Sequence, residues 1–209
     1  LPREEVEDVL LLRDKLNRSD LSTNLKIATS GPRRKAQLLG INSGFHIVPI
    51  RGNIQTRIDK MATEKLDGLV VAKAALNRLK ISHPNIYIFS EEEMLPAAAQ
   101  GAIGIEVIKE NIETKTNNLL ESINDNLTFE ATEIERTVVA ALQGNCLSPI
   151  SALCKIRDQN VELKVRVSNQ KGSEVYDQKE IFTLDNKIQA LEDFIEKLIS
   201  NGAKTLIQN

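Results

Sequence analysis

One cysteine of this 209-residue chain lies where its sulfur could react. Cys146 stands in a polar segment, with a glycine two residues before it, between a predicted helix and a predicted strand. A reagent can reach a thiol in such a loop, whereas it cannot reach a thiol inside a core. Cysteine is still more often a small buried side chain than a reactive group, and Cys154, inside an apolar stretch, is expected to be of that kind. Position alone therefore leaves both interpretations of Cys146 open.

Two arginines follow two hydroxyl side chains where the first predicted strand turns into a helix. Thr29 and Ser30 end the strand, and Ser30 is the expected helix cap. Pro32 suits the first helical turn, and Arg33 and Arg34 follow it. The free N–H groups of a helix start attract anions, and guanidinium groups suit carboxylates or phosphates. An ordinary capped helix with solvated arginines fits this segment equally well.

A second strand-to-helix turn also carries arginines. Arg51 ends a predicted strand, and Asn53 is the expected cap of the next helix. Arg57 lies four residues after Asn53 and so shares its helix face. Because ligands bind at the carboxyl ends of parallel strands, arginines at two successive strand ends favour an anion site over a solvated surface. Arg78, at the end of a third helix, either joins this cluster or offsets the helix dipole.

Strands and helices alternate along the first half of the chain, which predicts a parallel, doubly wound α/β domain. Helix and strand cannot be separated for residues 4–17, and residues 100–107 are predicted to form a strand rich in small residues or a hinge. The remaining predicted strands are residues 25–29, 45–50, 68–72 and 86–89, and the predicted helices are residues 32–39, 54–65 and 73–79.

The second half predicts a small α+β domain with a three-stranded antiparallel sheet. Residues 161–167 alternate apolar and polar side chains, as expected of a strand with one buried face. The other predicted strands are residues 149–156 and 174–183, with a hairpin turn at 169–172, and the predicted helices are 112–123, 129–142 and 186–200, the last one stopped by Gly202.

Composition excludes several classes of protein. Lys and Arg number 27 against 29 Asp and Glu, and aromatic residues are 3%, which argues against a nucleic-acid binder. His46 and His83 lie far apart and no Cys-x-x-Cys pair occurs, so no metal site is expected. No apolar run is long enough for a bilayer, so no membrane partner is expected. Without a signal segment or a disulfide pattern, a cytoplasmic location is the default. The first residue is Leu1 rather than Met, which suggests a processed or truncated product.

Several segments, taken in order, resemble the porphobilinogen deaminase (hydroxymethylbilane synthase) family. They are Ala-Thr-Ser-x-x-Arg-Arg from Ala28, Arg-Gly-Asn-x-x-Thr-Arg from Arg51, Ala-x-x-Asn-Arg-Leu from Ala74, Leu-Pro-x-x-x-Gln-Gly-Ala-x-Gly-Ile-Glu from Leu95, and Glu-Arg-x-x-x-x-x-Leu-x-Gly-x-Cys-x-x-Pro-Ile from Glu135. No single motif would suffice, but their order and spacing together are specific to that family.

The resemblance implies a transferase of tetrapyrrole (heme) biosynthesis that joins four porphobilinogen units into hydroxymethylbilane, with loss of one ammonia per unit. The chain would grow on a dipyrromethane cofactor that is bound covalently through Cys146. The implied cofactor-binding residues are Cys146, Arg33, Arg34, Arg51, Thr29 and Ser30, and the implied substrate-binding residues are Arg57, Asn53, Arg78 and Gln100. The implied partner is porphobilinogen alone, and the complete enzyme is expected to be a monomer.

The resemblance also implies a domain layout. A periplasmic-binding-protein-like α/β domain would span residues 8–94, and a cofactor-attachment domain would span 111–209. Residues 1–7 and 95–110 would belong to another domain, whose N-terminal part has no counterpart here. That part carries a Lys-Asp pair whose Asp is the family's catalytic carboxylate, so the catalytic residue stays unknown. We therefore expect these residues alone not to turn over porphobilinogen.

Two residues depart from the family pattern. Asn145 and Ala99 stand where the family has glycine, which puts the cofactor loop and the hinge conformation in question. Asn can adopt a left-handed turn, so the loop is expected to form. The competing function is a non-catalytic anion-binding α/β module, because the arginine turns would suit any small dicarboxylate or phosphate. A covalent adduct on Cys146 would distinguish the two.

Overall fold

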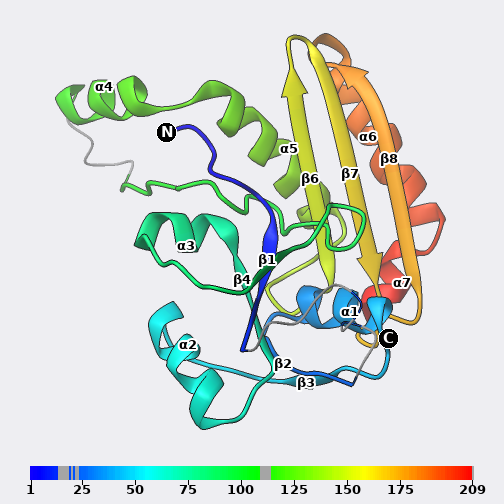
Figure 1. Cartoon of the computed structure of the whole chain (residues 1–209). Helices are drawn as coiled ribbons and strands as arrows, with labels where there is room; N and C mark the ends of the chain where they lie inside the picture. Colours follow the sequence, from blue (N-terminus) through cyan, green and yellow to red (C-terminus); the bar gives the residue numbers. More distant parts are fainter. Residues whose placement is uncertain (14–18, 20, 22–23, 109–113, 209) are drawn as a thin grey trace.

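The computed structural model describes residues 1–13, 19, 21, 24–108 and 114–208, which form two sheets with helices packed on them (Figure 1). The first sheet has the order β3-β2-β4-β1-β5, and the second has the order β6-β7-β8. The predicted fold class is confirmed: an α/β part is joined to a part with a three-stranded antiparallel sheet.

The first sheet is mixed rather than wholly parallel. Its strands β2 (Lys26–Ala28), β3 (His46–Val48) and β4 (Gly68–Ala72) run parallel, as the alternation of elements predicts. Strand β1 (Asp8–Leu12) lies between β4 and β5 (Ile86–Ile88) and is antiparallel to both. The first residue of β1 therefore lies at the edge of the sheet where β4 ends.

Strand β1 settles the ambiguity of the apolar run near the amino terminus. All its residues are buried, and its side chains alternate between two cores. Leu10 packs with Leu38 of α1 (Pro32–Ile41), while Leu11 packs with Met61 of α2 (Ile54–Thr63) and Leu76 of α3 (Lys73–Leu79). Helices on both faces explain why a strand can be continuously apolar. Residues 14–17 of the predicted segment lie outside the described residues.

The two expected helix caps have different outcomes. Asn53 caps α2 as predicted, since its side chain accepts a hydrogen bond from the Thr56 amide at 2.8 Å. The prediction for Ser30 is wrong, because Gly31 holds the cap position of α1 without a side-chain bond. Ser30 instead donates its hydroxyl to the Ile50 carbonyl at 2.5 Å and accepts from the Ile50 amide at 2.9 Å. The hydroxyl thereby joins the two arginine turns instead of starting the helix.

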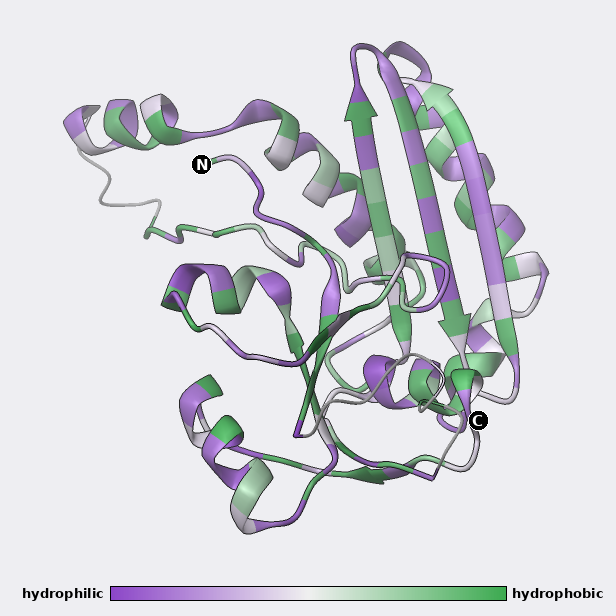
Figure 2. Ribbon diagram, in the orientation of Figure 1, coloured by the Kyte–Doolittle hydropathy of each residue, from purple (hydrophilic) through white to green (hydrophobic). Residues whose placement is uncertain are grey.

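The second sheet is covered on one face by helices. Strands β6 (Ile150–Arg157), β7 (Asn160–Ser168) and β8 (Val175–Thr183) are antiparallel. Their inward side chains pack against α5 (Asn126–Ala141) and α6 (Lys187–Ser200). The alternation predicted for β7 is visible as alternating hydrophobic and hydrophilic bands (Figure 2). After Gly202 the chain forms a further short helix, α7 (Ala203–Gln208), which the sequence did not predict.

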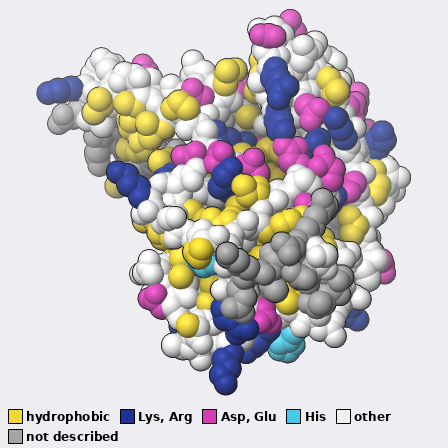
Figure 3. All heavy atoms as spheres, in the orientation of Figure 1, with side chains coloured by type: hydrophobic (Ala, Val, Ile, Leu, Met, Phe, Trp, Pro, Cys, Tyr) yellow, Lys and Arg dark blue, Asp and Glu magenta, His cyan; other side chains and the backbone are white. Residues whose placement is uncertain are grey.

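The predicted strand at residues 100–107 is wrong. The chain makes a turn at Gly101, whose φ is +88°, and then runs extended without a ladder in the described structure. Ile103 and Ile105 are about half exposed. Helix α4 (Thr114–Ile123), on the same side of the molecule as this segment (Figure 1), buries no side chain, and hydrophobic side chains gather on this part of the surface (Figure 3). The predicted helix at 112–123 begins in residues that lie outside the described part, and its described part matches α4.

Candidate functional site

A pocket of about 360 Å³ brings the loop cysteine and the first arginine turn together. The pocket is lined by the start of α1, with Arg33 and Arg34, and by the loop that carries Cys146. Gln100 and the small residues Ala97 and Ala98 also line it. Its size is within the range of small-molecule sites. Residues more than a hundred positions apart in the sequence thus face one cavity.

The loop presents the Cys146 sulfur to solvent. Leu147 donates its amide to the Asn145 side-chain oxygen at 2.8 Å, and the Asn145 amide donates to the Ser148 hydroxyl at 3.1 Å. Gly144 is packed so tightly that an added Cβ would lie 2.4 Å from a methyl group of Ile150. Asn145 therefore braces the loop through its side chain. The left-handed conformation expected of it belongs instead to Gln143, whose φ is +57°.

The second cysteine has the opposite environment. Cys154 is 3% exposed in the middle of β6, as predicted. Burial, together with the charge of Glu135, raises the pKa of its thiol to about 12. Because the thiolate is the reactive form, Cys154 is inert at neutral pH. Covalent chemistry at a cysteine of this chain falls to Cys146.

The two arginines of the first turn share one buried carboxylate. Arg33 donates from Nη2 to Oδ2 of Asp8 at 2.7 Å, and Arg34 donates from Nε to Oδ1 at 2.9 Å. Burial opposes ionisation of Asp8, but the two guanidinium charges outweigh it and hold the pKa of that carboxyl below its ordinary value. Arg33 is almost enclosed, with 8% of its side chain exposed, whereas 18% of Arg34 is exposed. Arg34 is therefore the more accessible of the two cations.

Asp8 was not among the residues that the sequence pattern predicted for the site. The only available signal was an acidic residue directly before the apolar run Val9–Leu12. An acid at that point is unusual in a buried strand unless it has a partner. Finding the partner required knowing that β1 is antiparallel to β4, because only that direction brings Asp8 to the edge where α1 begins.

Two other predicted site residues, Gln100 and Thr29, are bound by the protein itself. Gln100 donates from Nε2 to the Val6 carbonyl at 2.6 Å and to Asp8 at 3.1 Å, and its oxygen accepts from Arg33 at 3.2 Å. Thr29 is 5% exposed, and its hydroxyl accepts a long bond of 3.4 Å from the Gly31 amide. Both residues border the arginine pair and help to fix it.

The second turn and Arg78 lie outside the pocket that contains Cys146. Arg51 is exposed, and Arg57 donates from Nε to the Gly52 carbonyl at 2.7 Å. Arg78 donates to the Gly101 carbonyl at 2.5 Å and so contacts the turn that follows Gln100. The Ser30–Ile50 hydrogen bonds connect the second turn to the first. The cations therefore lie along one edge of the sheet without sharing one cavity.

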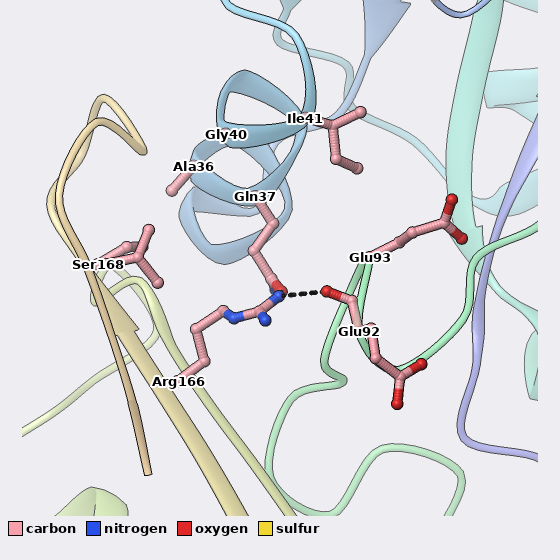
Figure 4. A pocket seen from close by; sticks show the side chains of 9 residues that line it. Ala36, Gln37, Gly40, Ile41, Glu92, Glu93, Arg166 and Ser168 are labelled. Carbon is pink, nitrogen blue, oxygen red and sulfur yellow. Dashed lines mark hydrogen bonds between the residues drawn. The ribbon is translucent and has the colours of Figure 1, made fainter. Parts of the chain in front are cut away.

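Helix α1 is fastened to the second sheet, which fixes the arginine pair relative to Cys146. Gln37 donates to the Leu95 carbonyl at 2.9 Å and to the Ser151 hydroxyl at 3.1 Å. Its oxygen accepts from Arg166 of β7 at 3.0 Å, and Arg166 also donates to the Glu92 carbonyl at 3.1 Å. Gln37, Arg166 and Glu92 border a second pocket of about 340 Å³ between α1 and β7 (Figure 4).

The arrangement can hold an anionic organic molecule through a covalent bond and through hydrogen bonds to cations. The Cys146 sulfur can form a thioether, and the neighbouring guanidinium groups can bind carboxylates by charge-assisted hydrogen bonds. Among the described residues, no group of three or more His, Cys, Asp and Glu side chains could hold a metal ion. Within the same residues, none of the helices has the length and apolar character needed to cross a membrane.

Two family models match the chain. Residues 1–116 match "Porphobilinogen deaminase, dipyromethane cofactor binding domain", and residues 129–194 match "Porphobilinogen deaminase, C-terminal domain".

Similar curated proteins carry the same name. A porphobilinogen deaminase of Clostridium novyi is 40% identical over 177 residues, which cover 83% of this chain and 58% of that protein. One from Clostridium acetobutylicum is 42% identical, covering 74% of this chain and 52% of that protein. One from Campylobacter lari is 32% identical over 208 residues, covering 99% and 67%. The chain thus spans about half to two thirds of the length of these relatives.

Proposed function

The chain belongs to the porphobilinogen deaminase family, and from this premise we propose that it provides the cofactor attachment point and part of the carboxylate-binding surface of a hydroxymethylbilane synthase. In the complete enzyme, four porphobilinogen units would be joined with loss of one ammonia per unit. The product would enter tetrapyrrole biosynthesis.

The observation that carries this proposal is the shared pocket of Cys146 and the arginine pair. A dipyrromethane group needs one nucleophilic sulfur for its thioether and several cations for its acetate and propionate groups. An exposed thiol that lines the same pocket of about 360 Å³ as Arg33 and Arg34 fits both requirements. When bound, the cofactor supplies the primer to which porphobilinogen units are added.

We assign the residues of this chain different tasks. Arg34, which is partly exposed beside Cys146, would bind a cofactor carboxylate directly. Arg33, Thr29 and Ser30 would act mainly by shaping the turn, since their polar groups bond within the protein.

Arginines outside the pocket would bind the pyrrole chain at later stages, when it has grown longer than the cofactor. Arg51, Arg57 and Arg78 lie along the same edge of the sheet and could receive the carboxylates that accumulate as units are added. Gln100 would hold Arg33 and Arg34 in place. Asn53, which caps α2, would fix the helix that carries Arg57. A growing polyanion requires several cations in a row, which this edge provides.

The predicted domain layout also stays a proposal. An α/β domain at 8–94 agrees with the extent of the first sheet, from β1 to β5. The attachment domain at 111–209 would contain the second sheet, and the segments 1–7 and 95–110 would belong with the remaining part of the family protein. The boundary at 110 and 111 lies outside the described residues. We further infer that the complete enzyme is a monomer in the cytoplasm, and the two free cysteines support the reducing location.

Intact-protein mass spectrometry tests the proposal. The purified chain is incubated with porphobilinogen and with a preassembled precursor of the dipyrromethane cofactor. It should then gain mass on the peptide that contains Cys146. The gain should disappear in Cys146→Ser and persist in Cys154→Ser, because Cys154 is buried. An unmodified chain that binds simple oxyanions at the arginine turns would favour the non-catalytic anion-binding module instead.

A steady-state assay tests the expectation about turnover. The family's Lys-Asp pair has no match in these residues, so cofactor attachment is expected without multiple turnovers. Ammonia release from porphobilinogen by these residues alone, at the rate of a full-length relative, would show that another carboxylate performs the reaction.

A further inference from the structure

A single buried carboxylate organises the arginine pair of the proposed cofactor pocket. Asp8 has no exposed surface and is the first residue of β1. It lies opposite Ala72, the last residue of β4, because the two strands are antiparallel. Since β4 is parallel to β2, Asp8 lies at the same edge of the sheet as the start of α1.

Both oxygens of this carboxylate are engaged. Oδ1 accepts from Nε of Arg34 at 2.9 Å and from Nε2 of Gln100 at 3.1 Å, and Nη2 of Arg34 lies 2.8 Å from the same oxygen. Oδ2 accepts from Nη2 of Arg33 at 2.7 Å. The carboxylate therefore contacts two nitrogens of the Arg34 guanidinium and one nitrogen of Arg33.

The two arginines are left in different states. Nη1 of Arg33 donates to the Leu95 carbonyl at 2.8 Å, so this cation bonds almost wholly inside the protein. Among the described residues, Arg34 contacts Asp8 through Nε and Nη2, which leaves its Nη1 without a hydrogen-bond partner. Two positive charges with one negative charge leave a net charge of one. A lowered pKa keeps Asp8 ionised well below neutral pH, so this balance holds throughout the physiological range.

We propose that Asp8 is a positioning residue: it orients Arg34 toward the pocket and limits the local positive charge, so that the site selects an organic carboxylate over small inorganic anions. A guanidinium fixed on one edge offers a bonding direction, which rewards a ligand whose carboxylate is held at the right place. Two unneutralised guanidinium groups would attract any compact anion. The charge balance rests on the geometry alone, and only the identity of the organic ligand rests on the proposed function.

The test compares two anions on one variant. Asp8→Asn keeps the size of the side chain but removes its charge and places an amide N–H group against the guanidinium donors. Porphobilinogen should bind roughly tenfold more weakly, while inorganic sulfate should bind roughly tenfold more tightly. Isothermal titration calorimetry on the 209-residue chain measures both affinities. Opposite changes are informative because simple loss of structure would weaken both.

Glu130→Gln is the matched control for net charge. Glu130 pairs with Lys187 and is absent from the pocket lining, so neither affinity should move by more than twofold. Should Asp8→Asn fail to fold, Arg34→Lys replaces it, because lysine keeps the charge without the fixed fork. That variant should keep the sulfate affinity and lose most of the porphobilinogen affinity.

A spectroscopic readout follows the orientation itself. The Arg34 Nε–H resonance should be sharp and protected from exchange in the parent chain and should broaden in Asp8→Asn. A parallel fall in both affinities, or no change in either, overturns the proposal. If the parent chain fails to bind porphobilinogen while sulfate affinity still rises in Asp8→Asn, the proposed function fails and the role of Asp8 stands.

Discussion

Arg3 and Glu135 form a two-point ion pair that fastens the start of the chain to α5. Nη1 of Arg3 lies 2.6 Å from Oε1 of Glu135, and Nη2 lies 3.1 Å from Oε2. Glu135 has no exposed surface and also accepts the amides of Ala99 at 2.6 Å and Cys154 at 2.7 Å. One carboxylate thus joins the amino-terminal segment, the turn before Gln100 and strand β6.

Glu135→Gln should therefore be strongly destabilising. The substitution leaves Arg3 without a counter-charge and places an amide N–H group against backbone donors, and losing one partner of a buried ion pair costs about 3–5 kcal/mol. Urea unfolding followed by circular dichroism measures the loss. Glu133→Gln is the control, because Glu133 is exposed on the same helix and should change the unfolding free energy by less than about 0.5 kcal/mol. Equal effects of the two substitutions would contradict the joining role of Glu135.

Ala99→Gly should stabilise the protein. Ala99 has a φ of +60°, in the left-handed region that an alanine side chain disfavours by about 1–2 kcal/mol. Glycine removes that cost, although it loses more chain entropy on folding, so a net gain of about 1 kcal/mol is expected. Ala98→Gly is the control: Ala98 has an ordinary φ, and its replacement should lose stability. Thermal unfolding of both variants decides the matter, and a lower Tm for Ala99→Gly would show that the strain is absent.

Local sequence pattern predicted the elements better than it predicted their pairing. The spans of β4 and α3 match the prediction residue for residue, because an apolar run followed by helical spacing has one local solution. Strand β1 was ambiguous because an apolar run buried on both faces has no periodicity. The false strand at residues 100–107 was apolar enough for a strand, but a ladder needs a partner, which no local pattern supplies.

Local pattern likewise predicted which residues of the candidate site matter, but not which distant residues they contact. Cys146, Arg33 and Arg34 were identified from residue type and position in turns, and the structure places them around one pocket. Asp8 was missed, since its importance comes from the antiparallel direction of β1. The internal bonding of Arg33 could not be foreseen either, because its partner Leu95 lies 62 positions away.

Acid should weaken the contact that Glu91 makes with the second sheet. Glu91 pairs with Lys155 and with Lys164, the latter at 2.8 Å. Burial opposes its ionisation, but the bonds to the two lysines hold the pKa of Glu91 below its ordinary value. A depressed carboxyl pKa contributes stability that is complete above the unfolded-state value, about 4.3, and disappears as the pH falls through the folded-state value.

Glu91→Gln should consequently lower the unfolding free energy by about 1 kcal/mol at pH 7, a typical size for a partly exposed pair. The gap between the parent chain and the variant should close as the pH falls below about 4. Urea titrations across this range measure it. Glu92→Gln serves as the comparison, because Glu92 is 79% exposed and only 3.9 Å from Lys164 at its nearest. A gap that widens in acid would refute the assigned sign.

The β7–β8 turn should tolerate no side chain at Gly172. An added Cβ would lie 1.9 Å from the Ala36 carbonyl oxygen and 3.0 Å from the Gly40 amide of α1, and the φ of Gly172 is +66°. Gly172→Ala therefore combines backbone strain with a clash against the helix that carries the arginine pair. Gly202 has a φ of +82° and nothing within 4 Å of an added Cβ, so Gly202→Ala isolates the strain alone.

We expect the free energy of unfolding to fall by about 1 kcal/mol in Gly202→Ala and by about 2–3 kcal/mol more in Gly172→Ala. Because the clash lies between α1 and the second sheet, only Gly172→Ala should also weaken cofactor attachment at Cys146, measured as the adduct fraction by mass spectrometry. If the two alanine variants lose equal stability, the turn does not pack on α1 as closely as described.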